Sequence, residues 1–400
     1  MLLGLLLLFI TVWAGNRIYS PMVRTLTTIV NDHWQDRPVM ELGSNDVLYI
    51  GFDELSHDAH RYVCHITHCE ADWSESTDVF ESDWLEGFND YPIDDYQNSL
   101  NTTVSYTHYA FQIPNRQCRI RMSGNYRLTI YDEDANHAKV LDAEFFVVEP
   151  LMNIGINMTT NTDIDVNRSH QQLSISLDYN DVKVTCPEDE IYTVVMQNWN
   201  EQTARVNPQP NYRFHQGMRW EHQRELIFEA GNEFHKFEIL DVSHPTMGID
   251  RMAWDGERFQ AYPFITTQRR NYLTDESANG AFLIRNSDQT EIDYTCDYVW
   301  VNYQLDAPYS GEIFLQGQWT TNATPAAYQM QYDADRQCYM AQIMQKQGYY
   351  SYQYVDKAGL SAPTEGNFFQ TRNKYQALVY YKELGGRTWR LVGYRGLAAR

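Results

Sequence analysis

The sequence is poor in positive charge, with 31 Lys and Arg residues against 53 Asp and Glu residues and a formal net charge of −22. A surface this acidic repels phosphate backbones, so the deficit argues against nucleic-acid binding. It argues equally against docking on an anionic membrane surface. A protein partner with a basic or neutral docking face is compatible with this charge.

Catalytic motifs are also missing. We find no G-x-S-x-G nucleophile elbow, no glycine-rich phosphate loop and no HExxH metal motif. Asp94 and Asp95 would supply half of a glycosidase pair, but adjacent residues on a strand face opposite ways and nothing supplies the partner. The sequence therefore predicts a protein that is not an enzyme, with no catalytic residue and no cofactor.

Long apolar runs are absent after the N-terminus. The single run, LLGLLLLFITVWA at 2–14, has roughly the length of a signal peptide and is too short for a comfortable transmembrane helix. Val12 and Ala14 suit a small-residue cleavage site, so we expect residues 1–14 to be a signal peptide cleaved after Ala14. The mature chain is then not inserted in the membrane. The usual positive residues before the run are missing, which leaves an uncleaved anchor or a misassigned start as the alternative.

The cysteines do not form the clustered framework of a small disulfide scaffold, because the six are spread over the whole chain. CHITHCEADW (64–73) nevertheless combines Cys64, His65, His68 and Cys69, which raises the possibility of a zinc site or a disulfide. On a strand, neighbouring residues point to opposite faces, and Cys64 and His68 lie about 13 Å apart along the chain. We therefore expect a structural strand with buried thiols and no metal site.

Amphipathic helical patterns are scarce, whereas alternation of apolar and polar residues recurs. RYVCHITH (61–68) places Tyr62, Cys64, Ile66 and His68 on one face of a strand. Similar runs, separated by short polar turns, continue to the C-terminus, as in β-sandwiches. The sequence predicts an all-β fold of three consecutive immunoglobulin-like or early-set β-sandwich domains. EPLMNIG and NSDQTE suggest their boundaries, which gives domains at 15–150, 151–287 and 288–400.

Residues 70–95 carry ten acidic side chains and neither Lys nor Arg. Clustered carboxylates suit calcium, but their spacing matches no calcium loop, and charge runs are usually solvated. Two Trp and two Phe interleave with the acids. We expect an ordered surface or docking loop that packs on a sandwich.

Several motifs together resemble one family. HCEADW (68–73), DYQNSLNTTVSYTHYAFQIPN (95–115) and SGNYRLTIYDED (123–134) resemble the N-terminal domain of the type IX secretion system plug protein of Bacteroidetes. DYVWVNYQL (297–305) and GYYSYQYVD (348–356) continue the resemblance in order along the chain.

The resemblance implies a non-enzymatic, all-β plug. Such a protein binds the periplasmic end of a large outer-membrane translocon β-barrel and seals it when no cargo is in transit. It also implies a periplasmic location, on the inner side of the outer membrane, and a monomer within the complex.

Candidate partner-binding residues come from the YTHYAF strand and from the third domain. In YTHYAF (106–111), one face is expected to be core, and the other is either an interface or solvent-exposed. In the third domain, IFLQGQWTT and GYYSYQYV resemble an early-set fold that also occurs in glycogen-binding modules, so a periplasmic or surface carbohydrate-binding protein is the alternative function. The candidates are Tyr106, His108, Tyr109, Trp300, Trp319 and Tyr352.

Overall fold

The computed structural model describes residues 15–58, 60–322 and 324–399. The expected signal peptide, 1–14, lies outside the described residues. The all-β prediction is confirmed, because strands dominate and each described helix is a single short turn. Within the described ranges, no helix is long and apolar enough to cross a membrane.

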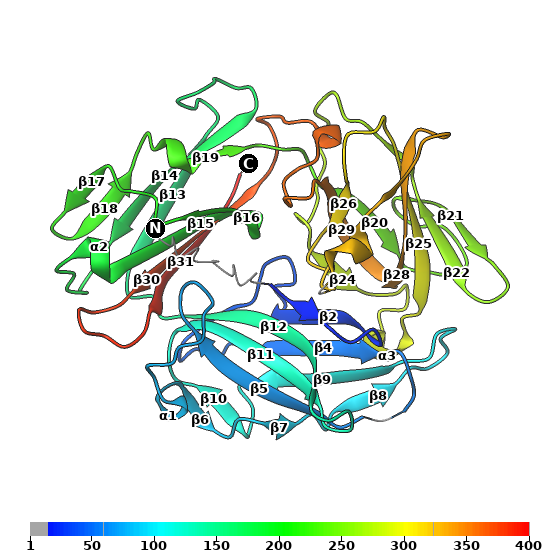
Figure 1. Ribbon diagram of the computed structural model, residues 1–400, viewed down its shortest axis with the longest axis horizontal. Coiled ribbons are helices and arrows are strands. Elements are labelled where there is room, and N and C mark those ends of the chain that lie inside the picture. Colours follow the sequence, from blue (N-terminus) through cyan, green and yellow to red (C-terminus); the bar gives the residue numbers. More distant parts are fainter. Residues whose placement is uncertain (1–14, 59, 323, 400) are drawn as a thin grey trace, which may run out of the picture.

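The strands form three β-sandwiches, which we call modules 1, 2 and 3 (Figure 1). Module 1 comprises residues 15–149, module 2 comprises 150–230 and 370–399, and module 3 comprises 231–369. In Figure 1, module 1 lies at the bottom, module 2 at the upper left and module 3 at the upper right.

Module 1 packs one sheet of order β1-β12-β11-β5-β7, with β3 beside β12, against a second sheet of order β2-β4-β9-β8. A two-stranded ribbon, β6 with β10, closes one end. The elements are β1 (Arg17–Ile18), β2 (Val23–Val30), β3 (Val39–Glu41), β4 (Leu48–Glu54), β5 (Tyr62–Cys69), α1 (Glu81–Trp84), β6 (Leu85–Gly87), β7 (Tyr91–Pro92), β8 (Tyr96–Asn98), β9 (Thr107–Ile113), β10 (Cys118–Ile120), β11 (Gly124–Asp132) and β12 (Ala138–Val148).

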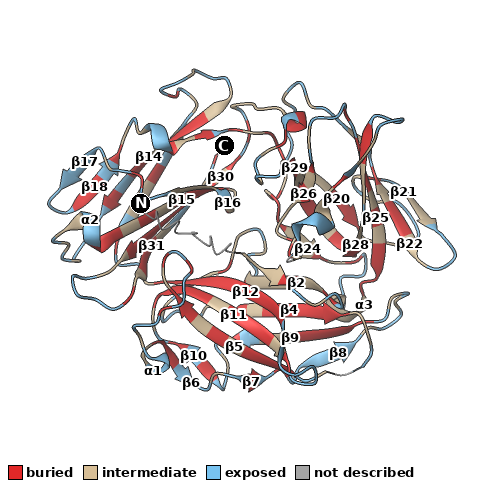
Figure 2. Ribbon diagram, in the orientation of Figure 1, coloured by how far each residue is buried: buried red, intermediate tan, exposed pale blue. Residues whose placement is uncertain are grey.

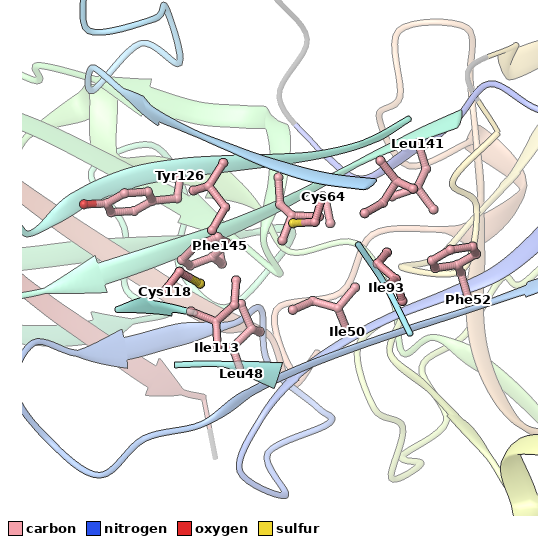
Figure 3. Packing of buried hydrophobic residues seen from close by; sticks show 14 of the residues in the cluster. Leu48, Ile50, Phe52, Cys64, Ile93, Ile113, Cys118, Tyr126, Leu141 and Phe145 are labelled. Carbon is pink, nitrogen blue, oxygen red and sulfur yellow. The ribbon is translucent and has the colours of Figure 1, made fainter. Parts of the chain in front are cut away.

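Alternating side chains of the two sheets fill the core of module 1. Leu48, Ile50 and Phe52 of β4 point toward Cys64 and Leu141 of the facing sheet (Figure 3). All five are fully buried. The predicted inward face of β5 is confirmed, since every second residue from Tyr62 to His68 is buried.

Module 2 is built from two separated parts of the chain. Its sheets have the orders β13-β14-β18-β17, with β19 beside β14, and β16-β15-β30-β31. The elements are β13 (Asn153–Thr159), β14 (His170–Asp178), α2 (Pro187–Glu190), β15 (Ile191–Gln197), β16 (Asn200–Val206), β17 (Tyr212–Phe214), β18 (Gly217–Trp220), η1 (Arg224–Leu226), β19 (Ile227–Glu229), β30 (Lys374–Tyr381) and β31 (Arg390–Ala398).

Module 3 packs a sheet of order β20-β29-β24, with β26 beside β29, on a sheet of order β21-β22-β25-β28-β27, with β23 beside β25. The elements are β20 (His235–Ile239), β21 (Ile249–Trp254), β22 (Phe259–Pro263), β23 (Thr266–Thr267), β24 (Phe282–Ile284), α3 (Ile292–Thr295), β25 (Tyr298–Asp306), β26 (Phe314–Gln316), η2 (Pro325–Tyr328), β27 (Gln331–Asp333), β28 (Cys338–Lys346), β29 (Gly348–Val355) and η3 (Pro363–Glu365).

The order of the modules differs from the predicted consecutive domains. β30 pairs with β15 from Ile191↔Tyr381 to Gln197↔Tyr375, so the end of the chain completes module 2 and module 3 is inserted within it. In Figure 1 the red strands β30 and β31 lie among the green strands of module 2. The boundary expected at 287/288 therefore does not separate the last two sandwiches. Strand pairing is non-local, so a run such as YQALVYYKEL carries no signal of which sheet it joins.

Candidate functional site at the junctions between modules

The structure corrects the predicted contact face, because a buried ring offers no surface to a protein partner or to a sugar. Trp300 of β25 keeps partial exposure. The other candidates are buried, namely Tyr106 and Tyr109 at 0%, Tyr352 at 3%, and His108 and Trp319 at 8% relative exposure. The indole N–H of Trp319 donates to the Ser351 carbonyl oxygen at 3.1 Å, within module 3.

Both faces of the YTHYAF strand are occupied within the chain. Tyr109 packs in the core of module 1, with ring centroids 5.3 Å from Phe52 and 4.8 Å from Tyr62. Tyr106, on the opposite face, donates its hydroxyl to the carbonyl oxygen of Cys296 in module 3 at 2.7 Å. The second face is thus an interface, and the partner it meets is module 3.

A buried ion pair lies at this junction of modules 1 and 3. Lys346 Nζ of β28 is 2.7 Å from Asp53 Oδ2 of β4, and their side chains are 1% and 0% exposed. His108 Nδ1 lies 2.6 Å from the other Asp53 oxygen, and the Tyr298 hydroxyl donates to Asp53 Oδ2 at 2.7 Å. Burial alone would raise the pKa of Asp53, but the charges and hydrogen bonds of Lys346 and His108 hold it below its ordinary value.

Backbone contacts extend the same junction. The Thr103 amide and hydroxyl both donate to Asp297 Oδ2, at 2.8 and 2.7 Å. Near the N-terminus, the Ile18 amide donates to the Thr321 carbonyl oxygen at 2.7 Å. The two modules are therefore joined at separate points along their length, and this resists rotation of one against the other.

The junction of modules 1 and 2 is an apolar cluster. Trp199, in the turn between β15 and β16, stacks on Phe146 of module 1 and on Tyr394 of module 2, with centroid distances of 5.6 and 5.7 Å. In Figure 2, β12 of module 1 is red along most of its length, in keeping with its burial. The buried members are Cys69, Ala71, Trp73, Phe146, Val148, Met196, Trp199, Leu378, Tyr380 and Leu391.

The acidic segment 70–95 takes part in this junction. Glu70 accepts hydrogen bonds from the Thr388 hydroxyl at 2.7 Å and the Trp389 amide at 2.9 Å, both from module 2. Trp73 and Trp84 are buried, as the packed-loop prediction requires.

Two phenylalanines of the same acidic segment point outward. The relative solvent exposures of Phe80 and Phe88 are 74% and 75%. Sequence pattern alone does not separate these rings from the buried tryptophans, because all four alternate with acidic residues. Aromatic residues, phenylalanine included, are enriched in the cores of protein–protein interfaces.

Glu365 lies where the chain leaves module 3 to return to module 2. The carboxylate is 2% exposed, forms an ion pair with Arg269, and lies 3.1 Å from His235 Nε2. The Tyr354 amide also donates to it, at 2.9 Å. Burial opposes ionisation, but the charges of His235 and Arg269 outweigh it and lower the pKa of Glu365 to about 2.

The lowered pKa of the Glu365 carboxylate predicts that the folded protein loses stability in acid. A depressed folded-state pKa stabilises the fold above the ordinary pKa of glutamate, and that stability is lost as the pH falls toward 2. The lowering of the Glu365 pKa from 4.5 to about 2 corresponds to about 3 kcal/mol of folding stability. We expect the free energy of unfolding of Glu365→Gln to depend less on pH than that of the wild type below about pH 4.5, as measured by denaturant titration across that range. Parallel pH profiles would contradict the assignment.

The thiols and histidines of CHITHCEADW do not converge. Cys64 points into the core of module 1, whereas Cys69 belongs to the junction cluster with module 2. Both are free thiols, and burial raises their pKa values, that of Cys69 to about 12. His68 Nδ1 lies 2.8 Å from the Ser76 hydroxyl oxygen.

A different group, which the sequence did not reveal, has metal-ligand spacing. One ligand atom each of His60, Asp132 and Asp134 lie within 4.8 Å of one another. Those atoms already have protein partners: His60 Nδ1 is 3.0 Å from Asp132, and the Arg61 amide donates to Asp134 at 2.9 Å. Ion pairing and turn formation account for this arrangement.

An open hollow of about 510 Å³ lies where the three modules meet. Trp34 of module 1, Lys374 of module 2 and Tyr349 of module 3 contribute to its wall. Two pairs of charges there join different modules: Lys374 Nζ is 3.1 Å from Asp36, and Arg372 is 3.7 Å from Glu276. The ion pairs in this hollow therefore help to hold the modules together.

Comparison with known proteins finds a related solved structure. No curated protein matches the chain. The crystal structure of a hypothetical protein from Parabacteroides merdae is 31% identical, covers 96% of this chain and 99% of its own, and superposes with a TM-score of 0.92. A collagen adhesin from S. aureus is 8% identical, with a TM-score of 0.12 over 96% of this chain and 95% of its own, a similarity too low to bear on the fold. The profile of the family described as type 9 secretion system plug protein 1st domain matches residues 23–149, which lie within module 1.

Proposed function

Because this chain belongs to the type IX secretion system plug protein family, we propose that it seals the periplasmic end of the outer-membrane translocon of that system when no cargo is in transit. Membership itself carries a role in type IX secretion and a place in the cell envelope. The family is one of secretion components and not of enzymes. Three finer points are inferred: that the chain forms a seal, that it acts from the periplasmic side, and that its partner is the translocon barrel.

The observation that supports a seal is the rigid joining of the modules. A pore wide enough for folded cargo passes small molecules unless the obstruction keeps its shape. Here the Lys346–Asp53 pair joins module 1 to module 3, and the Trp199 cluster joins module 1 to module 2. Packed interiors deform little, so the three sandwiches present one fixed outer surface.

The seal must also be reversible, because cargo has to displace it. Modest, exposed anchors suit such a contact better than a large apolar face. Phe80 and Phe88 directly flank α1 and β6, at one end of module 1 (Figure 1), and both rings are exposed. Asp83 in the same segment pairs with Arg387 of module 2 at 2.9 Å, so the rings lie at the rim of that junction. We assign these rings to the contact with the translocon, where basic residues would complement the surrounding carboxylates.

The test is complementation of cells that lack the gene. Deletion is expected to raise outer-membrane permeability to large antibiotics, and the wild-type chain is expected to restore the barrier and to co-purify with the translocon when cargo supply is blocked. A Phe80→Ser, Phe88→Ser variant should fold normally, co-purify at least about tenfold less and restore the barrier poorly, since anchor residues dominate binding energy.

Leu273→Ser is the matched control, because Leu273 is 77% exposed and belongs to module 3. It should behave as the wild type does. Unchanged permeability after deletion, together with a translocon free of this chain, would refute the sealing role. Full co-purification of the double phenylalanine variant would refute only the contact assignment.

A further inference from the structure

Gly15, the first described residue, lies against a buried carboxylate. β1 pairs antiparallel with β12, with Arg17 opposite Asp142, and this register brings Gly15 to Glu144. The backbone nitrogen of Gly15 donates to Glu144 Oε2, and the Glu144 amide donates to Asn16 Oδ1 at 2.9 Å. In Figure 1, β12 lies on the side of module 1 that faces the other modules. The chain is thus held to β12 before β1 begins.

The Glu144 carboxylate is only partly compensated by neighbouring charge. It is 4% exposed, and Arg127 Nη2 of β11 lies 3.4 Å from its other oxygen. Arg37 also approaches, but it is paired with Glu201 of module 2 at 2.6 Å. Cys69 of β5 is a further titratable neighbour. Burial, with a smaller contribution from Glu201, raises the pKa of Glu144 to about 7 despite the two arginines.

We propose that Glu144 is the receptor for the amino terminus of the processed chain. Hydrolysis of the Ala14–Gly15 peptide bond by a signal peptidase consumes one water molecule, leaves a carboxylate on Ala14 and frees the Gly15 amine. The amine takes up a proton and becomes an ammonium group, which forms an ion pair with Glu144. The inference rests on cleavage after Ala14 and is independent of the proposed seal.

The ion pair affects more than module 1. Three residues after Gly15, the Ile18 amide donates to Thr321 of module 3, so β1 bridges two modules. An ammonium at Gly15 fastens the start of this bridge, whereas the uncleaved chain offers Glu144 only a neutral amide. Removal of residues 1–14 therefore tightens the assembled structure after export, which is a processing-dependent switch.

The experiment compares two purified forms of the protein, released from a fusion tag so that the first residue is Gly15 in one and Ala14 in the other. At pH 7.5 the Gly15 form is expected to melt on the order of 3 to 6 °C higher. The gap should shrink as the pH falls from about 7 to 5, because protonation of Glu144 relieves its burial in the Ala14 form. Glu144→Gln, introduced into both forms, should abolish the gap at every pH.

Three results would each overturn the proposal. The first is equal melting temperatures of the two forms at pH 7.5. The second is an equal gap in the Glu144→Gln background, which would assign the effect to crowding by the added residue. The third is N-terminal sequencing of the exported protein that finds a first residue other than Gly15. A gap that depends on Glu144, together with Gly15 as the exported N-terminus, would support it.

Discussion

Lys346→Met is expected to lower the free energy of unfolding by about 3 to 5 kcal/mol, because it removes the ammonium and leaves Asp53 buried without its principal counter-charge. His108 and the Tyr298 hydroxyl still contact Asp53, but Lys346 makes the larger electrostatic contribution to holding this carboxylate ionised. The substitution keeps most of the side-chain volume, so the loss reports charge and not packing. Denaturant titration measures it, and limited proteolysis of the segments that form the junction of modules 1 and 3 should accelerate.

Two further variants separate the ion pair from general effects. Lys357→Met removes a surface pair with Glu312, in which the lysine is 80% exposed, and should be close to neutral. Adding Asp53→Asn to Lys346→Met should recover much of the lost stability, since no buried charge then remains unpaired. If the single and double variants were equally unstable, the ion pair would not be the cause.

Trp199→Ala is expected to cost about 3 to 5 kcal/mol, because it opens a cavity in the cluster between modules 1 and 2. The ring is 3% exposed and stacks on both Phe146 and Tyr394, so both modules lose contacts. The backbone here has a φ of +55°, which alanine also adopts at a cost, so the difference reports the ring. Thermal and denaturant unfolding measure the loss.

Trp254→Ala is the matched control for this cavity, because Trp254 is 51% exposed on an edge strand of module 3. It should change stability by less than about 1 kcal/mol. Small-angle scattering adds a readout of shape: Trp199→Ala should expand the native protein, since module 2 is no longer held to module 1. An unchanged radius of gyration with full stability would contradict the role of this junction.

Local structure was predictable because it depends on local pattern. The inward face of β5, from Tyr62 to His68, follows directly from residue alternation on a strand. The all-β class follows from the same alternation repeated along the chain. These features need no knowledge of what lies across the interface.

The junctions were not predictable, because their partners are remote in sequence. Asp53 and Lys346 are 293 residues apart in the sequence, and neither belongs to a motif that indicates a buried charge. Tyr106 and His108 looked like candidate contact residues because aromatic and polar side chains alternate there. The structure covers them with module 3, and only burial distinguishes such a face from an exposed one.

The pairing of β15 with β30, and of β30 with β31, has a kinetic consequence. During synthesis or export from the N-terminus, all of module 3 is available before residues 374–398 appear. Module 3 can therefore complete its own core while the sheet of module 2 that contains β15 and β16 still lacks β30 and β31. β30 and β31 then close module 2 and its contact with module 1 in one step, so the emergence of residues 374–398 sets the moment at which the three modules become joined.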